Sequence, residues 1–224
     1  MSRWPDRLRD MTTSSTRSTS STSSRSGSYH HGDLRQALVS EAVRIIREEG
    51  EKALSMRKLA LNIGVSRTAS YHYFADKQAL LCAIAEEGFR RYNAMLSEVH
   101  ENGQRPPSAE SMRDFVRGYV QFATEQTEYY DLMFGGHIWE SGTSTDSLRK
   151  ESHNSFRNYV SNVRNWKEQG LISDKVDALR FSQVSWSTLH GISRLIIDGI
   201  YADSAAIEPI CQNAAEMFWR ELAP

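Results

Sequence analysis

The 224-residue sequence has two cysteines, five prolines and no run of eighteen apolar residues. A chain without such a run offers no segment long enough to span a bilayer as a helix. The first residues also lack the apolar stretch of a signal peptide, so we expect a cytoplasmic protein. Cys82 and Cys211 stand far apart within helical patterns, which favours isolated core thiols over a structural disulfide.

The common catalytic and metal-binding motifs are also missing. No His-x-x-x-His, Glu-x-x-His or Cys-x-x-Cys spacing is present for a metal ion, and the histidines His137, His153 and His190 are scattered. The sequence contains no Gly-x-Ser-x-Gly elbow and no phosphate-binding loop. We therefore expect no catalytic residues, no metal site and no cofactor.

The net charge is close to zero, but the charged residues are unevenly distributed along the chain. The net charge is −1, yet residues 1–77 carry thirteen basic and eight acidic residues, and residues 78–224 carry fourteen and twenty. Between Lys52 and Lys77 there are five basic residues and one acid, Asp76. Such asymmetry indicates that the N-terminal part faces a polyanion, although a solvated charged surface is the simpler alternative.

The most informative segment that is present runs from Ser55 to Lys77, SMRKLALNIGVSRTASYHYFADK. Ser55 can cap a first short helix, and Gly64 supplies the left-handed turn position that stops it. Ser66 can cap a second helix that runs to about Phe74. This arrangement predicts a DNA-binding helix-turn-helix, although two ordinary surface helices joined by a glycine turn have the same spacing.

The second helix is expected to lie in the major groove, because its exposed side offers an arginine, hydroxyls and small donors. Tyr71 and Tyr73 have hydroxyls that can reach phosphates, and Lys77 opens the next helix, where free backbone amides favour an anion. The predicted DNA-binding residues are Ser55, Met56, Arg57, Ser66, Arg67, Thr68, Ser70, Tyr71, His72, Tyr73 and Lys77.

The run from Ser55 through GVSRTASYHYFADKQALL resembles the DNA-binding domain of TetR-type transcriptional regulators. The opening YHHGDLRQAL, Tyr29 to Leu38, is similar to the start of the first helix in one subgroup of that family. That subgroup also has a Trp-x-x-x-His-Gly signature in its sensor domain, and Trp186, His190 and Gly191 stand at this spacing.

The resemblance implies phosphate contacts for Tyr71 and Lys77 and a ligand that releases the protein from DNA. Two residues depart from the family pattern. Tyr73 stands where the family more often has His, and Ser70 where this subgroup often has Pro. Because both lie on the recognition helix, these departures bear on the operator sequence and not on the DNA-binding role.

The N-terminal tail differs in composition from the rest of the chain. From Thr12 to Ser28, fourteen of seventeen residues are Ser or Thr. Such a segment buries too little apolar area to offset its ordering entropy, so we expect residues 1–28 to be disordered. Arg17 and Arg25 can follow phosphates or enter a minor groove, and a passive solubilising tail is the alternative.

Beyond the tail, apolar spacing predicts an all-α protein with about nine helices. Residues 29–75 form a three-helix helix-turn-helix domain, and residues 76–224 a helical ligand-sensing and dimerisation domain. The helix from Asp76 to about Val99 continues into the second domain and is the natural lever between them. The last two helices, within residues 174–222, include one without a clear polar face, so we expect them to form a four-helix bundle with a second copy.

Aromatic and soft side chains in the C-terminal half suggest a ligand pocket, although large residues at helical spacing also form ordinary cores. His190 lies one turn from Trp186 and is equally suited to a ligand contact or a buried hydrogen bond to backbone. The predicted ligand-binding residues are Phe122, Met133, Phe134, His137, Trp139, Trp186 and His190.

These features together predict a homodimeric repressor of transcription. Its partners are a double-stranded DNA operator, a second copy of the chain and an unidentified small hydrophobic or amphipathic inducer, with no membrane involved. The alternative is a ligand-independent repressor or architectural protein whose C-terminal half only dimerises.

Overall fold

The computed structural model describes residues 31–99, 105–139, 142–201 and 203–224. The tail predicted over residues 1–28 lies outside these residues. The described chain contains ten α-helices, one 3-10 helix and no strand, which confirms the all-α prediction. The helices are α1 (His31–Glu49), η2 (Glu51–Ala53), α2 (Met56–Asn62), α3 (Arg67–Tyr73), α4 (Lys77–Val99), α5 (Ala109–Glu125), α6 (Thr127–Phe134), α7 (Gly136–Trp139), α8 (Asp146–Glu168), α9 (Ala178–Ile197) and α10 (Ser204–Leu222).

The turn between α2 and α3 has the predicted local chemistry. The Ser55 hydroxyl accepts a hydrogen bond from the Lys58 amide at 3.2 Å, and the Ser66 hydroxyl accepts one from the Ala69 amide at 3.1 Å. Gly64 has φ 71°, in the left-handed region that favours glycine. Both helices therefore begin and end where the sequence places them.

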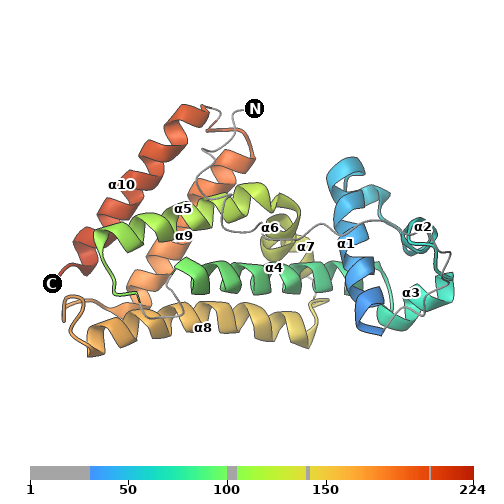
Figure 1. Cartoon of the computed structure of the whole chain (residues 1–224), viewed down its shortest axis with the longest axis horizontal. Helices are drawn as coiled ribbons and strands as arrows, with labels where there is room; N and C mark the ends of the chain where they lie inside the picture. Colours follow the sequence, from blue (N-terminus) through green and yellow to red (C-terminus); the bar gives the residue numbers. More distant parts are fainter. Residues whose placement is uncertain (1–30, 100–104, 140–141, 202) are drawn as a thin grey trace, which may run out of the picture.

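Helix α4 joins the two halves of the molecule (Figure 1). It begins after Asp76, whose carboxylate accepts a hydrogen bond from the Ala79 amide at 2.7 Å. Its first turns bury Leu80 and Ile84 in the same core as α1, and Leu96 near its other end is buried among the later helices. In Figure 1, α1, α2 and α3 lie at one end of the molecule, with α9 and α10 toward the other.

A glycine sets how closely α6 packs on α4. A Cβ built at Gly88 would lie 2.7 Å from the Met133 sulfur and 3.2 Å from the Tyr129 Cβ. No other residue fits at this point without moving α6 or the Met133 side chain. Gly88 therefore brings α6 into direct contact with the helix that connects both halves.

Some helix boundaries differ from those that residue spacing alone indicates. Asp33 is the candidate cap of the first helix in the sequence, but α1 begins two residues before it. Helix α5 begins at Ala109 and not at Ser111, because Ser108 caps it in a reciprocal capping box with Ser111. Helix α9 begins at Ala178 and not near Asp174, because the Asp177 carboxylate accepts hydrogen bonds from the next two free amides.

Two short helices, η2 and α7, were not predicted. The stretch from Gly135 to Thr145 was expected to be flexible, but α7 forms within it. Its Trp139 indole N–H donates a 2.9 Å hydrogen bond to the Met133 carbonyl, which ties α7 back to the end of α6.

The two last helices leave apolar side chains in solvent. Val184 on α9 is 64% exposed and Met217 on α10 is 56% exposed, while Ile200, just after α9, is 66% exposed.

Both cysteines are free thiols with buried side chains, and burial raises the pKa of Cys211 to about 11. Within the described ranges, no helix is long and apolar enough to cross a membrane.

The stability of variants at Gly64 should follow how well the new residue tolerates a positive φ. Nothing lies within 4 Å of a Cβ built there, so the penalty comes from the backbone alone. Gly64→Ala should lower the free energy of unfolding by about 1–2 kcal/mol, Gly64→Asn by less and Gly64→Val by more. Urea denaturation checks this order, and equal stability of the Asn and Val variants would contradict it.

Candidate DNA interface and sensor site

The outer face of α3 presents a small polar surface. Arg67, Thr68 and His72 are exposed, and Tyr71 is 43% exposed. The Arg67 guanidinium lies 5.8 Å from the centre of the Tyr71 ring, an arrangement that orients both side chains. These residues form one donor-rich face of the size that fits a major groove.

Two of the predicted DNA-binding residues have buried side chains, which the sequence did not indicate. Ser70 has no exposed surface, and its hydroxyl donates to the Arg67 carbonyl at 2.8 Å, inside the helix. The Met56 side chain is only 5% exposed and packs in the core behind the turn. Because both side chains are buried, we expect neither of them to contact a base.

The other predicted contacts remain on or near the surface. Ser55, Arg57 and Ser66 are exposed, with both serine hydroxyls engaged as caps. Tyr73 is half-buried, with its ring edge-on to His72. The Lys77 ammonium donates to the Glu51 carbonyl at 2.7 Å, so Lys77 braces η2 in the absence of DNA.

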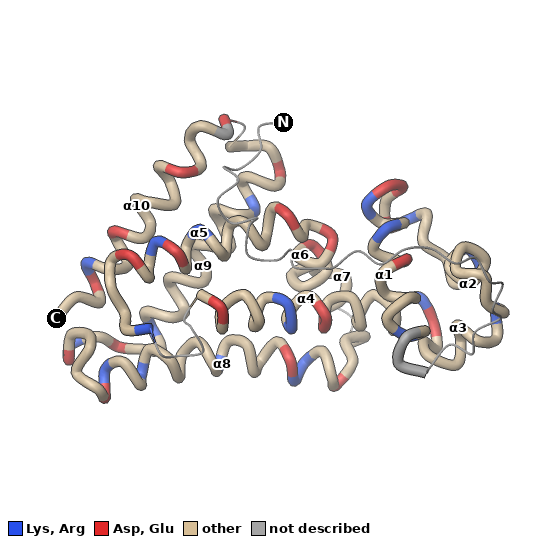
Figure 2. The backbone as a smooth tube through the Cα atoms, viewed as in Figure 1, with Lys and Arg blue, Asp and Glu red and all other residues tan. Residues whose placement is uncertain are grey.

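Charge on the helix-turn-helix is of one sign. The charged residues of α2 and α3 are Arg57, Lys58 and Arg67, all of them basic (Figure 2). Lys58 is paired with Glu49 of α1, whereas Arg57 and Arg67 are exposed. This end of the molecule therefore suits a negatively charged partner.

An open groove of about 490 Å³ lies in the other half of the molecule. Four of the predicted pocket residues line it: Met133, Phe134, Trp139 and Trp186. Sequence reasoning missed the remaining lining residues, which are Phe89, Ser152, His153, Phe156, Gln183 and Ser187. Phe156 lies 5.4 Å from Trp186, ring centre to ring centre, and nothing in the sequence distinguished it from the other apolar residues of α8, such as Tyr159 and Val163.

His190 lies beside this groove in a buried polar cluster, which we define as Tyr119, Tyr130, His190 and Ser193. The Tyr130 hydroxyl lies 2.8 Å from His190 Nδ1 and 3.3 Å from the Tyr119 hydroxyl. Of the two readings of His190, the buried hydrogen bond is observed, but its partner is a tyrosine and not backbone. Burial raises the pKa of Tyr130 to about 12, and burial together with Arg194 lowers the pKa of His190.

Two predicted pocket residues lie elsewhere. His137 is exposed on α7, and its Nε2 is 3.4 Å from a Glu51 carboxylate oxygen at the junction with η2. Phe122 is buried on α5, 5.8 Å from Tyr92 between ring centres, and does not line the groove. Neither residue lines the groove, and neither the turn of α7 nor the orientation of α5 is visible in the sequence.

A bidentate ion pair connects the helix-turn-helix end to the groove end. Arg47 of α1 donates to both carboxylate oxygens of Glu128 on α6, at 2.7 and 3.0 Å. The Arg47 hydrogen bond lowers the pKa of Glu128, so this carboxylate is charged at neutral pH. Because α6 also carries Met133 and Phe134, one short helix touches α1 at its start and the groove at its end.

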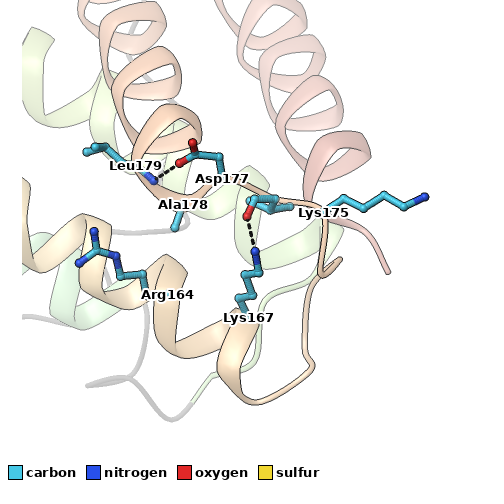
Figure 3. A pocket seen from close by; sticks show the side chains of 7 residues that line it. Arg164, Lys167, Lys175, Asp177, Ala178 and Leu179 are labelled. Carbon is cyan, nitrogen blue, oxygen red and sulfur yellow. Dashed lines mark hydrogen bonds between the residues drawn. The ribbon is translucent and has the colours of Figure 1, made fainter.

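A second cavity, of about 430 Å³, lies where α8 ends and α9 begins (Figure 3). Its basic residues do not converge: Lys175 points away from Lys167 and Arg164 (Figure 3). The Lys167 ammonium donates to the Val176 carbonyl at 2.8 Å, which is a structural role. No group of three or more His, Cys, Asp or Glu residues that could hold a metal ion occurs within the described residues.

The geometry is that of a helix-turn-helix protein with a separate helical half, and comparisons with known proteins give its family. Residues 38–84 match the model of "Bacterial regulatory proteins, tetR family", and residues 112–218 match "Tetracyclin repressor-like, C-terminal domain". Together these matches cover more than half of the chain. The chain belongs to the TetR family of bacterial regulatory proteins.

Individual relatives agree with this. An uncharacterised HTH-type transcriptional regulator of Mycobacterium tuberculosis is 31% identical over 54% of this chain and 51% of its own length. The repressor AcnR of Corynebacterium diphtheriae is 37% identical over 37% of this chain and 40% of its own. The chain thus spans about half or less of these curated relatives.

A solved structure extends the similarity to nearly the whole chain. A protein of unknown function from Rhodococcus sp. RHA1 has a TM-score of 0.74 and 33% identity, covering 88% of this chain and 98% of its own. Both halves described above are therefore present together in a second protein.

Substitutions of two exposed arginines should distinguish a contact to a base from a contact to a phosphate. Arg67→Ala should weaken binding to the preferred DNA site by about 1–3 kcal/mol while leaving binding to random DNA nearly unchanged, if Arg67 reaches a guanine edge. Arg57→Ala should weaken both equally and flatten the salt dependence by roughly one unit of slope. Fluorescence anisotropy at several salt concentrations measures both, and identical behaviour of the two variants would rule out base reading by Arg67.

Proposed function

We propose that this protein is a homodimeric transcriptional repressor that binds a specific operator and is released by a small apolar or amphipathic ligand. The observation that carries the proposal is the capped α2–α3 pair, whose outer face presents Arg67, Thr68, Tyr71 and His72. A chain with this face and with matches to both TetR models has the parts that operator binding and ligand response require.

Within this proposal the two halves have separate roles. Residues 29–75 bind DNA, and residues 76–224 bind the ligand and the second copy. Trp186, His190 and Gly191 stand at the Trp-x-x-x-His-Gly spacing, and we include a role for this signature in the proposal. Trp186 lines the groove and His190 belongs to the polar cluster behind it.

The second copy is expected to pack on α9 and α10, within residues 174–222. Val184 and Met217 are large apolar side chains left in solvent on these two helices, on an end remote from α3. Large apolar side chains that are left in solvent are typical of an interface when they form a patch, and we expect Val184 and Met217 to belong to one. Pairing through this end leaves both recognition helices free.

The ligand's effect is expected to pass through α6 as well as through α4, the lever predicted from the sequence. Helix α6 is tied to α1 by the Arg47–Glu128 pair and supplies Met133 and Phe134 to the groove. A ligand that displaces Phe134 therefore acts on the helix that holds α1. Such a shift changes DNA affinity only if the ligand favours one arrangement of α6 over the other.

The alternative is a ligand-independent repressor that uses its C-terminal half only to dimerise. The open groove of about 490 Å³, with its aromatic walls, is the feature that supports the ligand-responsive proposal.

Selection of DNA from a random pool tests the proposal directly. If the protein acts as a dimer, the selected site should be a near-palindrome with half-site centres about 34–36 Å apart, or a multiple of this. Recovery of asymmetric single sites alone, or of no preferred sequence, would contradict it.

Three lysine substitutions test the proposed dimer interface, two within it and one outside it as a control. Val184→Lys and Met217→Lys should give monomers by light scattering and select only single half-sites, because a buried lysine opposes the interface. Leu61→Lys alters a side chain that is 76% exposed on α2, away from that interface, and should leave the dimer intact.

The Arg47–Glu128 pair should contribute a measurable coupling between the two halves. A double-mutant cycle of Arg47→Ala and Glu128→Ala should give about 0.5–1 kcal/mol, modest because the Arg47 side chain is 57% exposed. Since the pKa of Glu128 is lowered in the folded state, this contribution is present above the ordinary glutamate value and disappears as pH falls through the folded value. Urea denaturation at pH 7 and pH 3 measures it, and a coupling that persists at pH 3 would contradict this origin.

A further inference from the structure

We propose that the ligand of the groove is an uncharged molecule whose hydroxyl or carbonyl group hydrogen-bonds to the polar cluster of Tyr119, Tyr130, His190 and Ser193. This inference rests on the proposed function, since it names the class of ligand for the same groove. Three observations carry it: the position of the cluster, an unpartnered hydroxyl within it, and the lack of Asp, Glu, Lys or Arg in the cluster and in the described lining of the groove.

The polar cluster lies directly behind one wall of the groove. Phe134 lines the groove, and its ring centre is 4.9 Å from that of Tyr130 and 4.6 Å from that of His190. Trp186 also lines the groove. Burial raises the pKa of Tyr119, and the Trp186 side chain partly offsets this rise, which indicates that Trp186 lies beside the cluster as well. Phe134 is only half-buried, and it is in ring contact with both Tyr130 and His190, so the proposal requires this side chain to rotate when the ligand binds.

The cluster holds an unfilled hydrogen-bonding position. Ser193 has no exposed surface, and its hydroxyl makes no hydrogen bond with good geometry, although Tyr130 lies beside it. A buried hydroxyl without a partner is unfavourable and uncommon in a folded protein. A ligand oxygen beside Ser193 and Tyr130 would give it a partner.

Neither the groove nor the cluster contains a carboxylate, lysine or arginine, and His153 is the one titratable side chain among the described residues that line the groove. The tyrosines keep their protons at neutral pH, since burial raises the pKa values of Tyr119 and Tyr130, and His190 is neutral because its pKa is lowered. The nearest cation on α9, Arg194, is already paired with Asp131 at 2.6 Å and with Asp198.

A ligand with a carboxylate or ammonium group would therefore leave a charge unpaired in an apolar site, which strongly opposes binding. An alcohol or ketone loses far less on leaving water, and the tyrosine, histidine and serine side chains can both donate to it and accept from it. The aromatic walls formed by Phe89, Phe156 and Trp186 then cover its apolar body.

A matched series of eight-carbon probes tests this on the full-length protein. We expect 1-octanol to bind at least ten-fold more tightly than octanoate or octylammonium at pH 7.5, measured by titration calorimetry with quenching of tryptophan fluorescence as a second readout. Equal or tighter binding of either charged probe overturns the proposal. Absence of 1-octanol binding up to its solubility limit overturns it as well.

Two substitutions locate the polar end of the ligand. Ser193→Ala removes a hydroxyl that has no partner in the free protein, so thermal unfolding should be unchanged while the affinity for 1-octanol falls five-fold or more. Tyr130→Phe should reduce it similarly, and Tyr201→Phe, at a tyrosine that is 40% exposed, should not. Unchanged affinity in both cluster variants overturns the assignment.

The same titrations separate this inference from ligand-controlled repression. If 1-octanol binds as expected but leaves the affinity for the selected operator unchanged, the ligand class stands and release from DNA by a ligand is refuted. If it binds and weakens operator binding, both stand.

Discussion

The whole structure depends on the burial of α4 in two places at once. Its first turns complete the core of α1, α2 and α3, and its later turns, including Phe89 and Tyr92, form the floor on which α5, α6 and α8 pack. Such a helix cannot shift in one half without changing packing in the other, because protein interiors are nearly close-packed. The Gly88 contact adds α6 to this unit, since the absence of a side chain at Gly88 lets Met133 of α6 pack directly on the α4 backbone.

The helix-turn-helix was predictable because its signals are local. A serine cap, a glycine at positive φ and a second serine cap act within a few residues, and each was found where the sequence places it. The burial of Ser70 was not predictable, since it depends on how α3 rotates against α1 and α4. A small polar residue on a short helix suits either face equally well.

The sensor half was predictable only in part. Met133, Phe134, Trp139 and Trp186 were recognised as large or soft residues, and they line the groove. Phe156 and the polar cluster were missed because they depend on the pairing of α8 with α9 and of α6 with α9, contacts between residues distant in sequence. His137 was predicted to line the pocket because of its residue type and its aromatic neighbours in the sequence. Instead it lies on the four-residue helix α7, close to Glu51.

The burial of Ser70 also limits how much sequence information α3 can read. With Arg67, Thr68, Tyr71 and His72 as the exposed side chains, each half-site can specify about four base pairs, and a dimer about eight. Eight specified positions recur about once in 65,000 base pairs, whereas a genome offers about 10⁶–10⁹ competing sites. Direct reading by α3 alone would thus leave tens of equivalent sites in a bacterial genome. Either the shape of the DNA and its phosphates add discrimination, or the protein controls many loci at once.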